Sequence, residues 1–113
     1  MIPYGEPGPL TDMERFVFDS LGYLVIPDAL TADETAAALE ACIRAHEGHP
    51  DDQWRQLGAT FEDEPALENI VDHPSILPQA RALYGDRCIL QSSWATVVPP
   101  GFTGGGIHQD GSS

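Results

Sequence analysis

The chain has 113 residues, enough for one small domain that buries roughly 65% of the surface its unfolded form exposes. Its composition, 42% apolar and 20% charged, is typical of a folded protein and not of a disordered one. The net charge of −13 repels phosphate backbones and anionic lipids, which disfavours nucleic acid and membrane partners and leaves the acidic residues as a solvated surface.

Residues 1–10 contain three prolines and two glycines, which predicts an extended or poorly ordered arm. The first helix is predicted over Asp12–Leu21. Thr11 and Glu14 have the spacing of a capping box, in which each residue bonds the backbone of the other, and Gly22 suits the position after the last turn.

The short β-prone run Tyr23–Ile26 is predicted to be a strand, either buried on both faces or at a sheet edge, and Pro27 ends it. A second capping box, formed by Thr31 and Glu34, opens the next helix. Its apolar stripe continues to a point near Gly48, so this helix is expected to be the longest.

The polar stretch 49–64 is predicted to be a loop, with a short β segment around Leu57–Phe61. Two helices are then expected, Pro65–Val71 and Pro74–Tyr84. Each begins with a proline, which the first turn of a helix tolerates, and Gly85 closes the second.

The segment Arg87–Val98 is rich in β-branched and apolar residues and is predicted to be a long strand, suited to a barrel. Gln91 and Ser93 share one face of it, where their hydrogen-bonding groups could bind a co-substrate or substrate or could face solvent. Trp94, on the other face, is expected to pack in the core. No linker divides residues 11–113, which predicts a single domain.

His108 and Asp110 stand two residues apart after this strand, and residues i and i+2 of a strand project from the same face. An imidazole and a carboxylate so placed are two ligands of the facial triad of non-haem iron sites. The alternative is a surface strand whose two side chains pair or face water. His49 and Asp51 have the same spacing, but a proline separates them after a predicted helix, which favours a solvated loop.

The remaining features favour a cytoplasmic protein. Cys42 and Cys88 have no metal-ligand spacing and are expected to be buried thiols in a reducing compartment, without a disulfide. The sequence has neither a signal peptide pattern at residues 1–10 nor an apolar run of about 18 residues.

Several motifs, taken in order, resemble the phytanoyl-CoA dioxygenase family. They are G-Y-L-V-I-P at 22–27, H-P at 73–74, P-G at 100–101 and H-Q-D at 108–110. The resemblance covers roughly residues 16–110. It implies an α+β fold in which N-terminal helices pack on a double-stranded β-helix, a barrel of the jelly-roll or cupin-like kind.

The same resemblance implies an iron(II)- and 2-oxoglutarate-dependent dioxygenase that hydroxylates a small organic molecule or an acyl thioester. His108 and Asp110 become iron ligands, and no residue is assigned as an acid–base catalyst. The family also uses a distal histidine and an arginine that holds 2-oxoglutarate, whereas only three residues follow Asp110 here. We therefore expect an inactive N-terminal fragment with an incomplete barrel, which self-associates through an unpaired barrel edge.

Two other interpretations stay open. The chain could be a non-catalytic binding or assembly module derived from this fold. It could also be a cupin-like metal protein, which would use inward-facing histidine and carboxylate ligands without 2-oxoglutarate.

Overall fold

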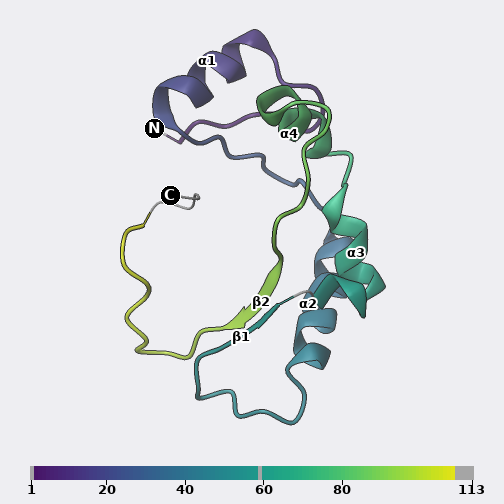
Figure 1. Cartoon of the computed structure of the whole chain (residues 1–113), viewed down its shortest axis with the longest axis vertical. Coiled ribbons are helices and arrows are strands. Elements are labelled where there is room, and N and C mark those ends of the chain that lie inside the picture. Colours follow the sequence, from purple (N-terminus) through teal and green to yellow (C-terminus); the bar gives the residue numbers. More distant parts are fainter. Residues whose placement is uncertain (1, 59, 109–113) are drawn as a thin grey trace.

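The structure is a computed structural model, and it describes residues 2–58 and 60–108. Over these residues the chain is a small α+β protein with four α-helices, one 3-10 turn and a two-stranded antiparallel sheet. Figure 1 shows α1, α4 and the N-terminal arm at one end and α2, α3 and the sheet at the other. None of the described helices is long and apolar enough to cross a membrane.

Helix α1 spans Asp12–Leu21, as predicted. The Thr11 hydroxyl accepts the backbone N–H of Glu14 at 3.1 Å, and the Glu14 carboxylate accepts the N–H of Thr11 at 2.8 Å, so the capping box is complete. Gly22 has φ 83°, the left-handed conformation that glycine adopts without a steric cost, and it ends the helix.

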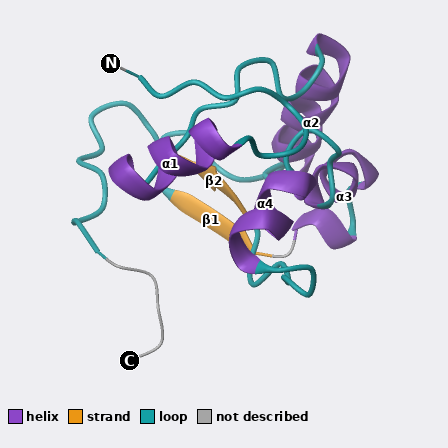
Figure 2. Cartoon of the chain, turned by 90° about the horizontal axis from the view of Figure 1, so that it is seen from above, coloured by secondary structure: helices purple, strands orange, loops and turns teal. Residues whose placement is uncertain are grey.

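Helix α2 spans Ala32–Ala45 and is the longest described helix, in agreement with the prediction. Thr31 and Glu34 form its capping box, with backbone bonds of 2.8 and 3.2 Å. Near its other end, Arg44 Nη2 lies 2.8 Å from Glu64 Oε2, just before α3. Figure 2 shows α2 and α3 side by side, to one side of the sheet.

The N-terminal arm is extended, as predicted, and it is tied to the body of the protein. Tyr4 and Val25 form an isolated parallel bridge, in which the Gly5 N–H donates to the Val25 carbonyl at 2.8 Å. The prediction of a strand over Tyr23–Ile26 is therefore wrong beyond this one bridge. The prolines of the arm have no N–H to donate, so the backbone hydrogen bonding does not extend beyond the Tyr4–Val25 bridge.

Helix α3 spans Pro65–Val71, as predicted, but α4 spans Leu77–Tyr84 and begins three residues later than the predicted start at Pro74. The reason is Pro78. In a helix that began at Pro74, residue 78 would have to donate its N–H to the Pro74 carbonyl, and Pro78 has no N–H, whereas a start at Leu77 places it in the first turn.

The sheet pairs β1 (Arg55–Gly58) with β2 (Trp94–Val97). β1 begins two residues before the predicted β segment at Leu57–Phe61 and overlaps it at Leu57 and Gly58. The end of that predicted segment is part of a 3-10 turn, Thr60–Glu62. The predicted strand Arg87–Val98 is reduced to the four residues of β2, because a strand requires a partner and β1 offers four residues. Residues 2–58 and 60–108 form this two-stranded sheet and no double-stranded β-helix barrel.

Apolar side chains are poorly covered in this fold. Apart from Pro3 and Gly5 in the N-terminal arm, Ala41 of α2 and Ala95 of β2 are the buried apolar residues of the described chain. Trp94 is 62% exposed, so the prediction that it packs in a core is wrong. Its side chain points away from the face of β2 that carries Ala95, and the described chain places no second layer over it.

Candidate functional site

The predicted metal ligands lie at the boundary of the described residues. His108 is described and exposed, in a segment without helix or strand, and Asp110 lies outside the described residues. Figure 1 shows the segment after β2 leaving the sheet on the side away from α2 and α3. The shared orientation of His108 and Asp110 stays a prediction.

Gln91 and Ser93 come together at a hollow of about 300 Å³ just before β2. Both lie outside the strand, Gln91 exposed and Ser93 half-buried. Glu62, from the 3-10 turn, also lines the hollow, and His108 does not. The structure thus groups the two predicted binding residues with a carboxylate and leaves the predicted metal ligand apart from them.

A metal site needs several converging donors, and iron sites of the proposed kind use two histidines and one carboxylate. No three histidine, cysteine, aspartate or glutamate side chains within residues 2–58 and 60–108 are grouped so that they could hold an ion. His108 has the right donor chemistry for iron, and its partner in the motif is beyond the described part. The described residues therefore contribute one ligand at most from this motif.

A hollow of about 600 Å³ lies between the end of α2 and β2. Its lining is mostly apolar and includes Ile43, Cys42 and Val97, together with His49 and Asp51 of the other H-x-D copy. His49 and Asp51 are exposed in a loop, which confirms the prediction of a solvated loop for that copy. Cys42 and Cys88 are both free thiols and are half-buried.

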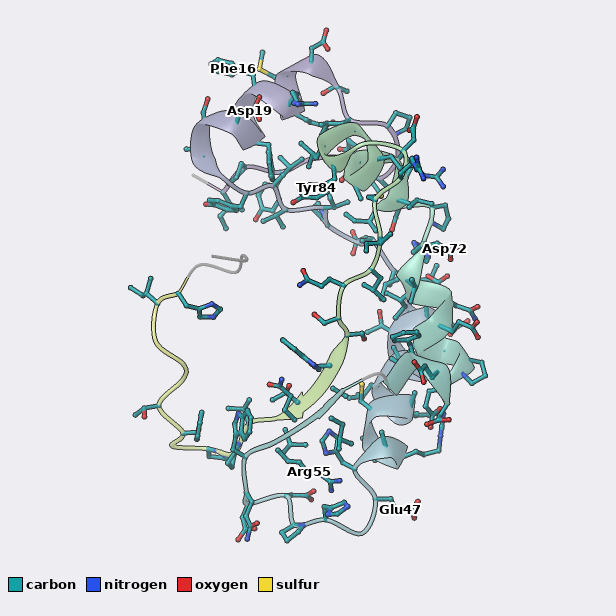
Figure 3. The ribbon with its side chains drawn as sticks, viewed as in Figure 1. Phe16, Asp19, Glu47, Arg55, Asp72 and Tyr84 are labelled. Carbon is teal, nitrogen blue, oxygen red and sulfur yellow. The ribbon has the colours of Figure 1, made fainter. Side chains whose placement is uncertain are left out.

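His46 is the buried histidine of this region, with 8% of its surface exposed. Its Nε2 lies 3.1 Å from the Ala95 carbonyl oxygen, so Nε2 carries the hydrogen, because a carbonyl can only accept. Its Nδ1 is buried without a partner among the described atoms. The sequence signal for its burial was present, since His46 continues the helical stripe of Ala38 and Cys42. Figure 3 shows Glu47 and Arg55 at the two ends of the loop that joins α2 to β1.

A second histidine, His73, links the start of α2 to the turn before α4. Its Nε2 lies 3.1 Å from Glu34 Oε1, and its Nδ1 lies 2.6 Å from Ser75 Oγ and accepts the Ser75 N–H at 3.2 Å. This order of carboxylate, imidazole and hydroxyl is that of nucleophilic triads. Ser75 is only 8% exposed, however, which closes it to a substrate. We assign the three residues a structural role.

Three carboxylates are stabilised in their charged form. Backbone hydrogen bonds, from Thr11 and then Glu6, lower the pKa of Glu14. The pKa of Glu34 is lowered by the Thr31 backbone first and by the hydrogen bond to His73 second. The side-chain hydrogen bond from Arg44 lowers the pKa of Glu64 and raises that of the guanidinium. All three carboxylates support helix ends, so they serve the fold.

Comparisons of the chain with models of protein families, with curated proteins and with solved structures found no match.

Proposed function

We propose that this chain carries the N-terminal part of an iron(II)- and 2-oxoglutarate-dependent dioxygenase of the phytanoyl-CoA dioxygenase type. The observation that carries the proposal is the order of four motifs along the sequence: G-Y-L-V-I-P, H-P, P-G and H-Q-D. Each is short, and it is their succession over roughly residues 16–110 that favours this family.

The local structure at the first two motifs supports the proposal. Gly22 is left-handed and separates α1 from the extended segment that follows, as the resemblance implies for the opening helix. His73 accepts hydrogen bonds within the H-P turn, which leads directly into α4.

In this proposal His108 and Asp110 hold iron(II), with further ligands from outside the described residues. The metal, once loaded with 2-oxoglutarate, would supply the activation of dioxygen that the hydroxylation of an unactivated carbon requires. The protein's own groups would orient the substrate and exclude water from the reacting centre.

Gln91 and Ser93 are assigned to the substrate rather than to the co-substrate. Their amide and hydroxyl groups can donate to an oxygen in the hollow that they line. Glu62 lines the same hollow, and a carboxylate there repels a doubly negative 2-oxoglutarate. An uncharged hydrogen-bonding group of a small molecule or acyl thioester fits this hollow better.

The proposal also includes a double-stranded β-helix barrel and a cytoplasmic location. A double-stranded β-helix would extend the sheet beyond β1 and β2 and would cover the exposed face of Trp94. A cytoplasmic compartment agrees with two free thiols, Cys42 and Cys88.

Cobalt(II) titration of the 113-residue chain tests the ligand assignment, because cobalt occupies iron sites and has a visible spectrum that reports its ligands. We expect His108→Ala and Asp110→Ala to weaken binding by about tenfold or more. His49→Ala and Asp51→Ala are the matched controls, since they remove the same donors at the same spacing. Equal losses in both pairs of variants would reject His108 and Asp110 as the metal ligands.

One observation favours a second candidate function, a binding or assembly module without catalysis. The described chain leaves large apolar side chains exposed from α1 to the residues after β2. Surfaces of this kind mark sites of association.

A further inference from the structure

The hollow of about 600 Å³ at the end of α2, which we call the α2–β2 hollow, is separate from the one lined by Gln91 and Ser93 and is not used by the proposed function. Its apolar wall consists of Leu39, Cys42 and Ile43 of α2 and Val97 of β2. Leu39 and Ile43 stand four residues apart, so they share one face of the helix, and they are 61% and 62% exposed. A hollow of this size with exposed apolar side chains is typical of a small-molecule site.

The charged part of the lining favours a cation. Glu47 and Asp51 line the hollow from the exposed loop after α2, and neither forms an ion pair within the described part of the chain. The arginine of the lining, Arg44, donates to the Glu64 carboxylate from Nε at 3.3 Å and from Nη2 at 2.8 Å, so its charge is compensated. Residues 40–55 as a whole hold four carboxylates against two arginines. The carbonyl end of α2 adds the negative pole of the helix dipole, so the hollow attracts cations and repels anions.

His46 adds one specific polar group to this lining. Only 8% of its surface is exposed, and its Nε2–H donates to the Ala95 carbonyl at 3.1 Å, which leaves Nδ1 as an acceptor. Nδ1 is buried and has no hydrogen-bond partner among the described atoms. A buried acceptor without a donor is unfavourable, so a ligand that brings an N–H to Nδ1 is favoured. Protein atoms cover Nδ1 in this structure, and a side-chain adjustment of the kind common on binding opens it to the ligand.

We propose that the α2–β2 hollow binds a small apolar amine in its protonated form, an alkylammonium or arylalkylammonium ion. The apolar part of the ligand lies against Leu39 and Ile43, where it covers side chains that are otherwise exposed. The ammonium group lies near Glu47 and Asp51, and one of its N–H groups donates to His46 Nδ1. This inference goes beyond the proposed dioxygenase function and does not depend on a metal.

Three ligands with the same chain and different head groups test the proposal: octylammonium, octanol and octanoate. Calorimetric titration of the 113-residue chain measures the affinity of each. We expect octylammonium to bind with a dissociation constant of about 1 mM or below. It should bind about tenfold more tightly than octanoate, because two carboxylates favour the cation over the anion, and octanol should fall between the two.

Substitutions separate the charged part of the site from its apolar part. Glu47→Gln combined with Asp51→Asn should remove most of the preference for octylammonium over octanoate and leave octanol binding unchanged. Glu68→Gln combined with Asp72→Asn is the matched control, because it removes the same two charges from exposed positions on α3 and at its end. Ile43→Ser should weaken all three ligands by about threefold or more, and its 62% exposure makes it a substitution that the fold tolerates.

Cys42 reports occupancy of the hollow directly, because its free thiol is part of the wall. In a Cys88→Ser background, octylammonium at twice its dissociation constant should slow the alkylation of Cys42 by iodoacetamide by about threefold. The Cys42→Ser background is the control, since Cys88 does not line the hollow and its alkylation should not change.

Four results would overturn the proposal. They are equal affinity for the three ligands, no saturable binding of octylammonium at about 5 mM, unchanged alkylation of Cys42 with the ligand bound, and the same loss of preference in the α3 control. Tighter binding of a lysine-rich peptide than of octylammonium would identify a protein as the occupant and reject the small molecule.

Discussion

His73 Nε2 and Glu34 Oε1 lie 3.1 Å apart, joining the N-terminus of α2 to the turn before α4. Glu34 also accepts the backbone N–H of Thr31 in the capping box. One carboxylate therefore closes a helix end and holds a segment 39 residues away. Both contacts favour the charged form of the Glu34 carboxylate, so protonation of Glu34 in acid weakens them.

We predict that stability falls as the pH drops below about 4.5, the ordinary pKa of a glutamate. The pKa of Glu34 is lowered in the folded state, so its contribution is complete above 4.5 and is lost as the pH falls through the folded value. Glu14 and Glu64 act in the same direction. Urea unfolding midpoints across this range measure the effect.

Glu34→Gln should flatten part of that acid dependence while it preserves the capping bond, because glutamine also accepts at this position and does not titrate. The control is Glu47→Gln, on the exposed loop after α2, which removes one carboxylate that does not cap a helix. An unchanged acid slope in Glu34→Gln would contradict the assignment.

Gly5→Ala should destabilise the chain by about 0.5–1.5 kcal/mol, because the ends of flexible side chains must move away from the new methyl group. A Cβ at Gly5 would lie 2.7 Å from Leu24 Cδ2 and 2.8 Å from Ile26 Cδ1, where the arm crosses the residues after α1. Gly104→Ala is the control, because a Cβ there meets no atom within 4 Å. Thermal unfolding of both variants compares them, and equal stability would show that the arm is not seated on Leu24 and Ile26.

His46→Ala should cost roughly 2 kcal/mol, because it removes a buried ring and the hydrogen bond to the Ala95 carbonyl. His49→Ala, three residues later and exposed, should change stability by less than about 0.5 kcal/mol. Chemical denaturation measures both. A similar cost for the two variants would indicate that His46 does not join α2 to β2.

The last prediction concerns turnover. In a longer form that releases succinate from 2-oxoglutarate, we expect His108→Ala to abolish iron-dependent turnover and His49→Ala to leave it nearly unchanged. Unchanged succinate release by the His108→Ala variant would contradict the assignment of His108 as an iron ligand.

Local sequence signals determined the helices. The capping boxes at Thr11 and Thr31 and the glycine at position 22 placed both helix starts and one helix end correctly, because these signals act within a few residues. The start of α4 was also encoded locally. Predicting it correctly required the position of Pro78 as well as that of Pro74.

The sheet and the burial of side chains were decided by tertiary structure. A strand exists only where another strand pairs with it, so β2 shortened to the four residues that meet β1 and left Gln91 and Ser93 outside. The alternation of residues along the strand correctly placed Trp94 on the face of β2 opposite Ala95. It did not indicate whether anything covers that face, and Trp94 is exposed. The same reason applies to His46: its helical stripe is visible in the sequence, whereas its partner, the Ala95 carbonyl, lies 49 residues away and is chosen only by the packing of α2 against β2.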